Sequence, residues 1–445
     1  MHRDVVVTGT GPICAAGIGV DAVWSAVCAG LSGVRALETV DGGALGMPFG
    51  GEVQGLKIRD CVPKSYRKAT KVMARDIELA VAAAKLAVED AGLVTRGSDD
   101  GAAGHAIDGK RTGCHIGAGQ ISADPVELGR AVSVSMDGAG RLDTAAWGTE
   151  GAGAQGAMDN LPPLWLLKYL PNMLACHVTI IHGCEGPSNT IMGAEAGALQ
   201  SIGESLRVIQ RGDADVCITG GAESRVNPMG LSRMRLAGRA GELPAGGDPA
   251  GAVRPFDGDS CGVIGEGGGM LILEASEAAS LRGAGVYARV AGFGCGMDTR
   301  PMTPGMEGIG DPEHDIGLVR AIRAALADAG IDGGEVDAVA PMASGMPGLD
   351  RRELGALRAA LGREDVEMIT VTPNAGNMLA GHGGVTAALA AVALRDQRLP
   401  ARVHGGTPMV EGAGACAARD ASLRHVLVCS GSYGGQAAAL VLSRV

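Results

Sequence analysis

A carboxylate occupies a position where the local pattern predicts a reactive side chain. Residues 186–199 read GPSNTIMGAEAGAL, and an apolar strand over 189–192 runs through small residues into a helix. Small residues on both sides of Glu195 permit a sharp strand-to-helix turn, a geometry that lifts one side chain to an exposed apex. A Ser or Cys nucleophile usually stands at such an apex. The sequence therefore predicts an elbow of the nucleophile type that carries a carboxylate instead.

The composition predicts an α/β protein whose core is built from Ala, Val, Leu, Ile and Met rather than aromatic residues. The chain has 445 residues, of which 46% are hydrophobic but only 2% aromatic, and it contains 74 glycines without a collagen period. The net charge of −11 disfavours a nucleic acid or an anionic membrane as partner. No apolar run reaches transmembrane length, and the first residues lead into a strand rather than a signal peptide. We expect a cytoplasmic protein with no membrane association.

Cysteine and histidine spacings do not predict a metal site. Eleven cysteines occur without a CxxC pair, and nine histidines without an HExxH motif or a Cys/His cluster. An odd cysteine count without a secretion signal indicates reduced thiols, most of them small core residues. The stretch GVIGEGGGM (262–270) resembles a phosphate loop, but it precedes a strand instead of a helix. A packed turn is the expected structure there.

The sequence repeats itself at half its length. Buried strands with Gly-rich turns at 4–19 and 287–301 are each followed by an amphipathic helix, at 77–93 and 316–331. Both helices end in Asp-Ala-Gly and an apolar residue, about 238 positions apart. Further strands are expected at 111–119, 215–224 and 336–345, a strand, turn and helix at 367–394, and the last strand at 425–435. Each half predicts a mainly parallel sheet covered by helices, and the two halves pack helix layer to helix layer.

Two further features concern the site and its surroundings. Active sites in such folds gather at the carboxyl ends of strands, which here are the segments around Glu195, Met342, Met378 and Gly431. The stretch 135–165 departs from the pattern and is rich in Gly, Ala and Asp, with two of the three tryptophans at or near it. It is either an insertion or lid over the first half, or a surface loop without function.

Six motifs in the same order resemble the β-ketoacyl-ACP synthases, condensing enzymes of the thiolase fold. They are VVVTGTGPICAAGIG (5–19), PNMLACHVTIIHGCEGPSNT (171–190), RGDADVCITGGAES (211–224), RPFDGDSCGVIGEGGGMLILE (254–274), PGLDRRE (347–353) and SYGGQAAALVL (432–442). The resemblance spans nearly the whole chain and implies a duplicated, thiolase-like αβαβα fold of five layers. It implies an N-terminal ketosynthase half over 1–280, with the insertion at about 135–165, and a C-terminal half over 281–445.

The resemblance assigns family roles to positions that hold unrelated residues in this chain. The family's nucleophilic Cys falls on Glu195, its two catalytic His residues fall on Met342 and Met378, and the Lys before the second His falls on Pro373. The bulky gating aromatic falls on Gly431, close to Tyr433 at the pocket or gate. His382 lies four positions after Met378 and takes the second imidazole role if the Gly-rich loop shifts.

These replacements predict loss of condensation. The family's Claisen condensation needs a soft nucleophile that accepts an acyl group from a thioester, and two imidazole donors that assist decarboxylation and stabilise the enolate. A Met thioether has no N–H to donate, and proline lacks the ammonium charge. The resemblance therefore narrows to the chain-length factors, or KSβ subunits, of type II polyketide and fatty acid systems, which commonly carry Gln where this chain has Glu195.

Three roles are open to Glu195. It can satisfy the N–H groups of an otherwise empty oxyanion pocket at a helix N-terminus, which is the structural reading and our expectation. It can support malonyl-ACP decarboxylation, although an ionised Glu repels malonate. It can act as general base in a new hydrolase or cyclase, for which no partner group is visible.

Partners follow from the same resemblance. It implies a heterodimer with a catalytic ketosynthase subunit, and an acyl carrier protein whose phosphopantetheine carries the substrates, with no other cofactor. Basic residues of KSYRKATKVMAR (64–75), namely Lys64, Arg67, Lys68 and Lys71, are candidates for docking the carrier protein, or else a solvated helix face. Two rivals are a stand-alone acyl-ACP enzyme, such as a decarboxylase that uses Glu195, and a purely structural homodimer or scaffold.

Overall fold

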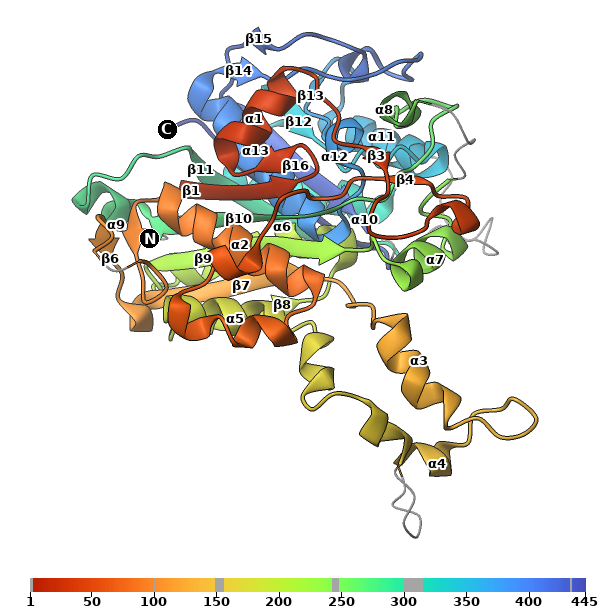
Figure 1. Ribbon diagram of the computed structural model, residues 1–445. Helices are drawn as coiled ribbons and strands as arrows, with labels where there is room; N and C mark the ends of the chain where they lie inside the picture. The colour runs from red at the N-terminus through yellow and green to blue at the C-terminus, as the bar shows by residue number, and fades with distance from the viewer. Residues whose placement is uncertain (1–2, 100, 149–155, 242–247, 300–314, 433) are drawn as a thin grey trace.

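Two half-sheets with the same internal order of strands form the centre of the molecule (Figure 1). The computed structural model describes residues 3–99, 101–148, 156–241, 248–299, 315–432 and 434–445. The first half-sheet runs β1 (Val5–Cys14), β10 (Glu266–Ala275), β9 (Val216–Ser224), β7 (Thr112–Ala118) and β8 (Ser188–Ile191). The second runs β11 (Ala288–Met297), β17 (Gln436–Ser443), β16 (His425–Gly431), β12 (Ala338–Ala340) and β13 (Glu367–Met368).

Four of the five main strands of each half-sheet run in the same direction, as the expectation of a mainly parallel sheet requires, and one strand is reversed. The reversed strand, β10 or β17, lies second from the line where the two halves meet and pairs antiparallel with both neighbours, and the outer pairs are parallel. The half-sheets meet where β1 and β11 pair antiparallel, Val6 with Arg289 and Val7 with Ala288. A strand buried on both faces reads as a continuous apolar run in either direction, so the sequence pattern did not reveal the reversal. The last strand is β17, one beyond the strand predicted at 425–435.

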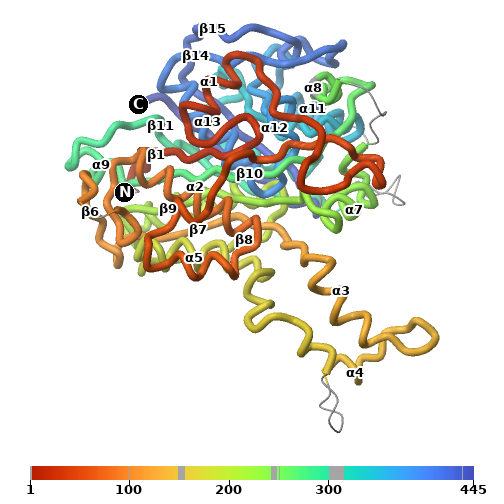
Figure 2. Tube along the Cα trace, in the orientation of Figure 1, coloured from red at the N-terminus to blue at the C-terminus, as the bar shows by residue number. Residues whose placement is uncertain are grey.

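Helices form three layers around the two half-sheets (Figures 1 and 2). α6 (Gly197–Gln210) and α13 (His382–Asp396) lie between them and pack against each other and against strands of both. α2 (Arg75–Asp90) and α5 (Met173–His182) cover the outer face of the first half-sheet. α10 (Ile316–Ala329) and α11 (Pro347–Leu361) cover that of the second. The predicted duplicated fold of five layers is confirmed.

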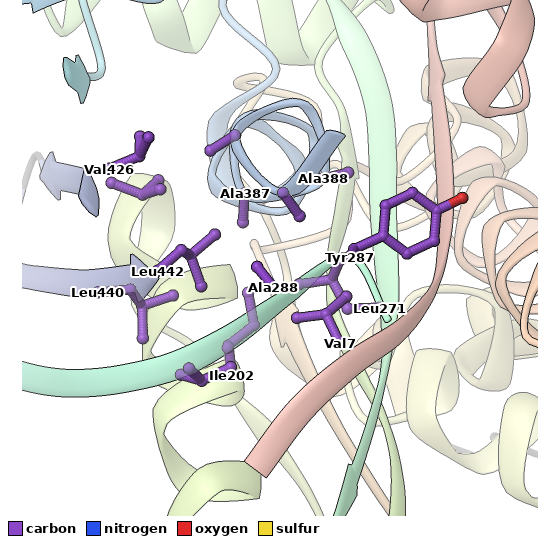
Figure 3. Packing of buried hydrophobic residues seen from close by; sticks show 14 of the residues in the cluster. Val7, Ile202, Leu271, Tyr287, Ala288, Ala387, Ala388, Val426, Leu440 and Leu442 are labelled. Atoms are coloured by element: carbon purple, nitrogen blue, oxygen red, sulfur yellow. The ribbon is translucent and has the colours of Figure 1, made fainter. Parts of the chain in front are cut away.

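The middle layer holds the largest core cluster, and its side chains are small (Figure 3). Ala387 and Ala388 of α13 face Leu271 of β10 and Leu442 of β17, all fully buried. This packing explains how a chain with 2% aromatic residues fills its core. The helices lie so close to the strands that a Cβ on Gly269 would come within 2.2 Å of the Gly384 backbone carbon. Residues 266–269 therefore form the start of β10. The packed turn expected at 262–270 is wrong for this part of the stretch.

Helix ends follow local chemistry. The Asp315 side chain accepts a hydrogen bond from the Leu318 N–H (3.0 Å) and caps α10, which ends at Gly330 with φ 69°. α2 begins at Arg75. The basic stretch before Arg75 is therefore not part of this helix, although the sequence suggested that it was. It forms two single 3₁₀ turns instead, η3 (Lys64–Tyr66) and η4 (Ala69–Val72).

An arm between β7 and α5 projects from the body (Figures 1 and 2). It comprises α3 (Pro125–Ser133), α4 (Thr144–Gly148), η6 (Ala157–Asn160) and η7 (Trp165–Lys168). α3 and η6 pack against each other rather than against the first half-sheet. The described part of the stretch at 135–165 is thus an outward arm, and it does not lie over the first half as a lid.

Short elements complete the fold. The remaining helices are α1 (Val20–Cys28), α7 (Pro228–Leu236), α8 (Pro249–Ala252), α9 (Ser276–Leu281) and α12 (Thr372–Ala375). The remaining strands are β2 (Gly17–Ile18), β3 (Arg35–Ala36), β4 (Phe49–Gly50), β5 (Leu93–Val94), β6 (His105–Ala106), β14 (Arg398–Leu399) and β15 (Arg419–Asp420). Among the helices described, none has both the length and the apolar character that a bilayer crossing requires.

Candidate functional site

The elbow at Glu195 has the geometry that the sequence predicts. β8 ends at Ile191, a single 3₁₀ turn, η8 (Ala194–Ala196), follows, and α6 begins at Gly197. Ala194 adopts φ 46°, a left-handed conformation that is costly for a residue with a Cβ. Glu195 comes directly after this strained residue and is 2% exposed. The carboxylate is therefore held inside the protein rather than at an exposed apex.

Arg239 is the cation that faces this carboxylate. Its Nη2 lies 4.0 Å from Glu195 Oε1, and both side chains are buried. The sequence analysis missed Arg239, which follows α7. A signal was present, because residues 224–241 contain four arginines and no acidic residue. Burial of an ionised carboxylate requires such a partner, so the pair accounts for the charge at the elbow.

A second strained loop brings Met342 to the same place. It follows β12, and the next residue, Ala343, has φ 46°. Glu353 of α11 accepts hydrogen bonds from the backbone N–H groups of Met342 and Ala343, both at 2.8 Å. Met342 thereby lines one cavity together with Glu195 and Gly431, three of the four segments predicted to converge.

The fourth predicted segment does not line the site. Met378 is fully buried in an apolar cluster with Cys14 and Leu389, and it borders neither of the two cavities at Glu195. The next residue, Leu379, has φ 47°, so this loop is strained like those at Ala194 and Ala343. The side chain of Met378 nevertheless reaches neither cavity. Pro373 is buried in α12, where its carbonyl oxygen accepts a hydrogen bond from Ser32 Oγ at 2.7 Å.

His382 does not supply an imidazole to the site. It begins α13, is 1% exposed, and lines neither cavity. Both ring nitrogens lack hydrogen-bond partners within the described structure, and burial lowers the pKa of the ring to about 4. A neutral, enclosed histidine of this kind cannot exchange protons with a substrate at Glu195.

The first cavity is narrow and acidic. It has a volume of about 50 Å³, enough for a few water molecules and too small for an acyl chain. Its charged lining residues are Glu195, Arg239, Asp298, Asp315, Asp350, Arg352 and Glu353. Arg352 Nη2 lies 2.9 Å from Asp298 Oδ2, and Asp350 accepts hydrogen bonds from the Phe256 N–H (2.9 Å) and Ser344 Oγ (2.8 Å).

Burial shifts the titration of these acids. Desolvation raises the pKa of Asp350 to about 6. Desolvation, with the nearby charge of Asp350, raises the pKa of Glu353 to about 8. The residues of this cavity mainly satisfy one another and hold the Met342 loop, so the arrangement is structural in character.

The second cavity is wide and contains arginines. It has a volume of about 560 Å³ and shares Glu195 and Arg239 with the narrow cavity. Its charged lining residues are Glu195, Glu223, Arg225, Arg233 and Arg239, and most of the others are apolar or small. Glu223 Oε1 lies 2.6 Å from Arg225 Nη2, and Glu223 Oε2 accepts a hydrogen bond from the Ala380 N–H at 3.0 Å. This volume falls in the range of small-molecule sites.

The remaining predicted positions are Gly431, Tyr433 and the basic docking residues. Gly431, at the end of β16, lines the narrow cavity, and a Cβ there would lie 2.8 Å from Asp315 Oδ2. Tyr433 lies outside the described residues. The predicted docking residues are all exposed, on or beside η3 and η4; they are Lys64, Arg67, Lys68 and Lys71. The described residues contain no cluster of His, Cys, Asp and Glu suited to a metal ion.

Comparison with known proteins establishes the family. The model described as Beta-ketoacyl synthase, N-terminal domain, matches residues 2–279, and that of the C-terminal domain matches residues 287–405. The chain is 30% identical to 3-oxoacyl-[acyl-carrier-protein] synthase 2 of Vibrio cholerae, covering 100% of this chain and 99% of that protein. It is 29% identical to the synthase of the same name from Staphylococcus aureus, with the same coverage. This chain belongs to the β-ketoacyl synthase family.

Solved structures agree with that assignment. The ishigamide ketosynthase/chain length factor matches with a TM-score of 0.80 and 25% identity, over 100% of both chains. A type II polyketide acyl-carrier protein in complex with its ketosynthase, bound to the hexaketide, matches with a TM-score of 0.81 and 23% identity, again over 100% of both chains. The thiolase-like fold and the family resemblance drawn from the six motifs are thereby confirmed.

Proposed function

We propose that this chain is a ketosynthase homologue that does not condense on its own and that serves as the chain-length-factor-like subunit of a heterodimeric ketosynthase in polyketide or fatty acid biosynthesis. One observation carries the proposal. Among the described residues, neither a thiol nor an imidazole lines the two cavities that meet at Glu195. The motif resemblance assigns the family's nucleophile to Glu195 and its two histidines to Met342 and Met378.

The chemistry of these side chains supports the proposal. A carboxylate is a poor nucleophile toward a thioester, and a thioether has no N–H to stabilise an enolate oxygen. Groups that act as a unit are lost together, so the remaining loop geometry cannot sustain condensation. The ion pair with Arg239 gives Glu195 a structural role that differs from the capping of an empty oxyanion pocket.

The proposed partners are a catalytic ketosynthase subunit and an acyl carrier protein. One matched structure is a ketosynthase/chain length factor, and another is a ketosynthase in complex with its carrier protein, which supports both partners. The exposed cations Lys64, Arg67, Lys68 and Lys71 are candidates for contact with the acidic carrier protein. Phosphopantetheine would arrive on that protein as substrate carrier, and no resident cofactor is proposed.

A second candidate function is malonyl-ACP decarboxylation by the isolated chain. The arginines of the wide cavity favour it, because a guanidinium next to Glu195 could hold the malonyl carboxylate. The same cavities offer no imidazole to the enolate that decarboxylation leaves. We therefore place it second.

The first experiment incubates the purified chain alone with malonyl- and octanoyl-carrier protein and follows the intact masses. We expect no loss of CO₂, no acyl adduct on the chain and no extended product. Acetyl-carrier protein that forms faster than in buffer would identify a decarboxylase and overturn the ranking. Extended ketoacyl-carrier protein would mean that another residue performs the condensation, and would overturn the proposal.

A Glu195→Cys variant tests the assignment of the elbow. A thiol at this position should gain an octanoyl adduct from the carrier protein, whereas the wild type, with eleven native cysteines, serves as the background. Condensation should still be absent from the variant, because Met342 and Met378 donate no proton. Addition of an intact ketosynthase that forms a heterodimer with this chain should then produce chain elongation with wild-type protein and with Glu195→Gln alike. Loss of product in Glu195→Gln with an intact heterodimer would assign Glu195 a chemical role.

A further inference from the structure

The wide cavity has a lining that combines apolar and cationic side chains. Met192, Met234, Leu236 and Leu379 contribute apolar surface, and three arginines contribute charge. All three arginines and three other lining residues come from 225–239, the stretch that contains α7 (Figure 1). A cavity of this composition suits an amphipathic ligand better than a purely hydrocarbon chain.

Two of the three guanidinium groups already have carboxylate partners. Arg225 Nη2 lies 2.6 Å from Glu223 Oε1, and its Nη1 also donates to Ser122 Oγ at 3.2 Å. Arg239 Nη2 lies 4.0 Å from Glu195 Oε1. The two glutamates of the cavity are therefore neutralised within the protein, and they leave one positive charge over.

Arg233 carries that remaining charge. Its side chain has no hydrogen bond and no ion pair within the described structure, and its Nη1 is completely buried without an acceptor. Nearly all buried donors in proteins have a partner, and a buried guanidinium N–H without one is costly. The planar fork of a guanidinium matches the two oxygens of a carboxylate. An anionic ligand in the cavity would supply the missing acceptor.

We propose that the wide cavity binds a ligand with an apolar chain and a carboxylate, and that Arg233 receives the carboxylate. The apolar lining accommodates the chain, and the pairing of Glu195 and Glu223 with the other two arginines limits their repulsion of the anion. The carboxylate could belong to a free organic acid or to the far end of an acyl chain held by a carrier protein. The proposal does not depend on whether the chain pairs with a ketosynthase, because it concerns a cavity within one chain.

The test is calorimetric titration of the purified wild-type chain with octanoate and with 1-octanol. The two probes have the same chain length and differ in the charged head group. We expect octanoate to bind at least tenfold more tightly than octanol, because a hydrogen-bonded charge pair is lost with the alcohol. Equal affinity for both, or no binding of octanoate, would overturn the proposal.

Arg233 variants locate the carboxylate. Arg233→Gln should weaken octanoate binding about tenfold or more and leave octanol unchanged, and Arg233→Lys should retain part of the affinity because it keeps the charge but loses the fork. Arg320→Gln, an exposed arginine on α10 outside both cavities, is the matched control and should bind octanoate like the wild type. Thermal unfolding by circular dichroism verifies that each variant is folded. An Arg233→Gln variant that is folded and binds octanoate normally would refute the assignment.

A second titration distinguishes the sources of the carboxylate. Octanedioyl-carrier protein presents a free carboxylate at the far end of its chain, and octanoyl-carrier protein does not. Tighter binding of the octanedioyl form, abolished by Arg233→Gln, would assign the site to tethered chains. Binding of free octanoate alone would assign it to a free acid, and failure of both would refute the site while leaving the proposed subunit role to its own experiments.

Discussion

The two cavities that share Glu195 and Arg239 differ in how far their charges are satisfied. In the narrow cavity, Asp350 and Glu353 accept backbone and side-chain hydrogen bonds, and Asp298 pairs with Arg352. In the wide cavity, Arg233 is left without a partner among the described residues. A self-satisfied set of charges holds a loop in place, whereas an unsatisfied one is prepared for a ligand. The elbow residue thus lies on the boundary between a structural region and a binding region.

Of the substitutions that test this contrast, Arg225→Met should cause the largest loss in the free energy of unfolding. Arg225→Met leaves Glu223 buried next to Glu195 without its counter-charge, and breaking a buried pair from one side typically costs about 3–5 kcal/mol. Urea denaturation should show that loss in the free energy of unfolding. Arg320→Met on the exposed face of α10 should change it by less than about 0.5 kcal/mol. A loss below about 1 kcal/mol for Arg225→Met would mean that water replaces the pair and that Glu223 and Arg225 are not held as a desolvated pair.

The pH dependence of stability should reflect the buried acids of the narrow cavity. The folded protein raises the pKa of Glu353 from 4.5 to about 8, so the folded state holds that proton more tightly than the unfolded state. Its contribution is therefore complete below about pH 4.5 and is lost as the pH rises to about 8. Glu353→Gln should make this decline in the free energy of unfolding shallower by a few kcal/mol.

Asp350 affects the same measurement. Its pKa is raised to about 6, so part of the decline should remain in Glu353→Gln and end at a lower pH. Denaturation of both proteins at intervals from pH 4.5 to 8.5 supplies the comparison. Parallel curves for the variant and the wild type would show that Glu353 is ionised throughout, with its two backbone hydrogen bonds outweighing burial.

The smallest effect is expected at Gly431. Gly431→Ala places a Cβ 2.8 Å from Asp315 Oδ2, and this carboxylate must shift while its other oxygen caps α10. We expect a loss of about 1 kcal/mol or less in the free energy of unfolding, as for a weakened helix cap. Octanoate affinity should stay unchanged, because Gly431 lines only the narrow cavity. A change in that affinity would show that the two cavities are coupled.

Much of the fold could be predicted because repetition is visible in a single sequence. The duplicated strand and helix patterns predict two equivalent halves, and the two half-sheets do share one strand order. The reversal of β10 and β17 could not be predicted, since both strands are buried on both faces and carry no directional signal. The glycines of β10 resemble a turn in sequence and prove to be a close approach of α13 to the strand.

The sequence predicted most of the segments that form the site, but it did not predict the arginines. Glu195, Met342 and Gly431 converge on one cavity because each lies at or shortly after the end of a strand. Met378 does not, because its side chain packs into the apolar cluster below its loop. Arg233 and Arg239 were overlooked, since arginines near an amphipathic helix usually face solvent. Only the three-dimensional structure shows that this stretch closes over a cavity.

The three left-handed residues beside the predicted catalytic positions have a consequence for engineering. Ala194, Ala343 and Leu379 each adopt φ of 46° or 47°, and a residue with a Cβ typically needs about 1–2 kcal/mol to do so. The main chain at Glu195, Met342 and Met378 is thus already bent, and the energy for bending it is already supplied by the surrounding packing. Side chains at these positions can therefore be substituted without redesign of the loops that carry them.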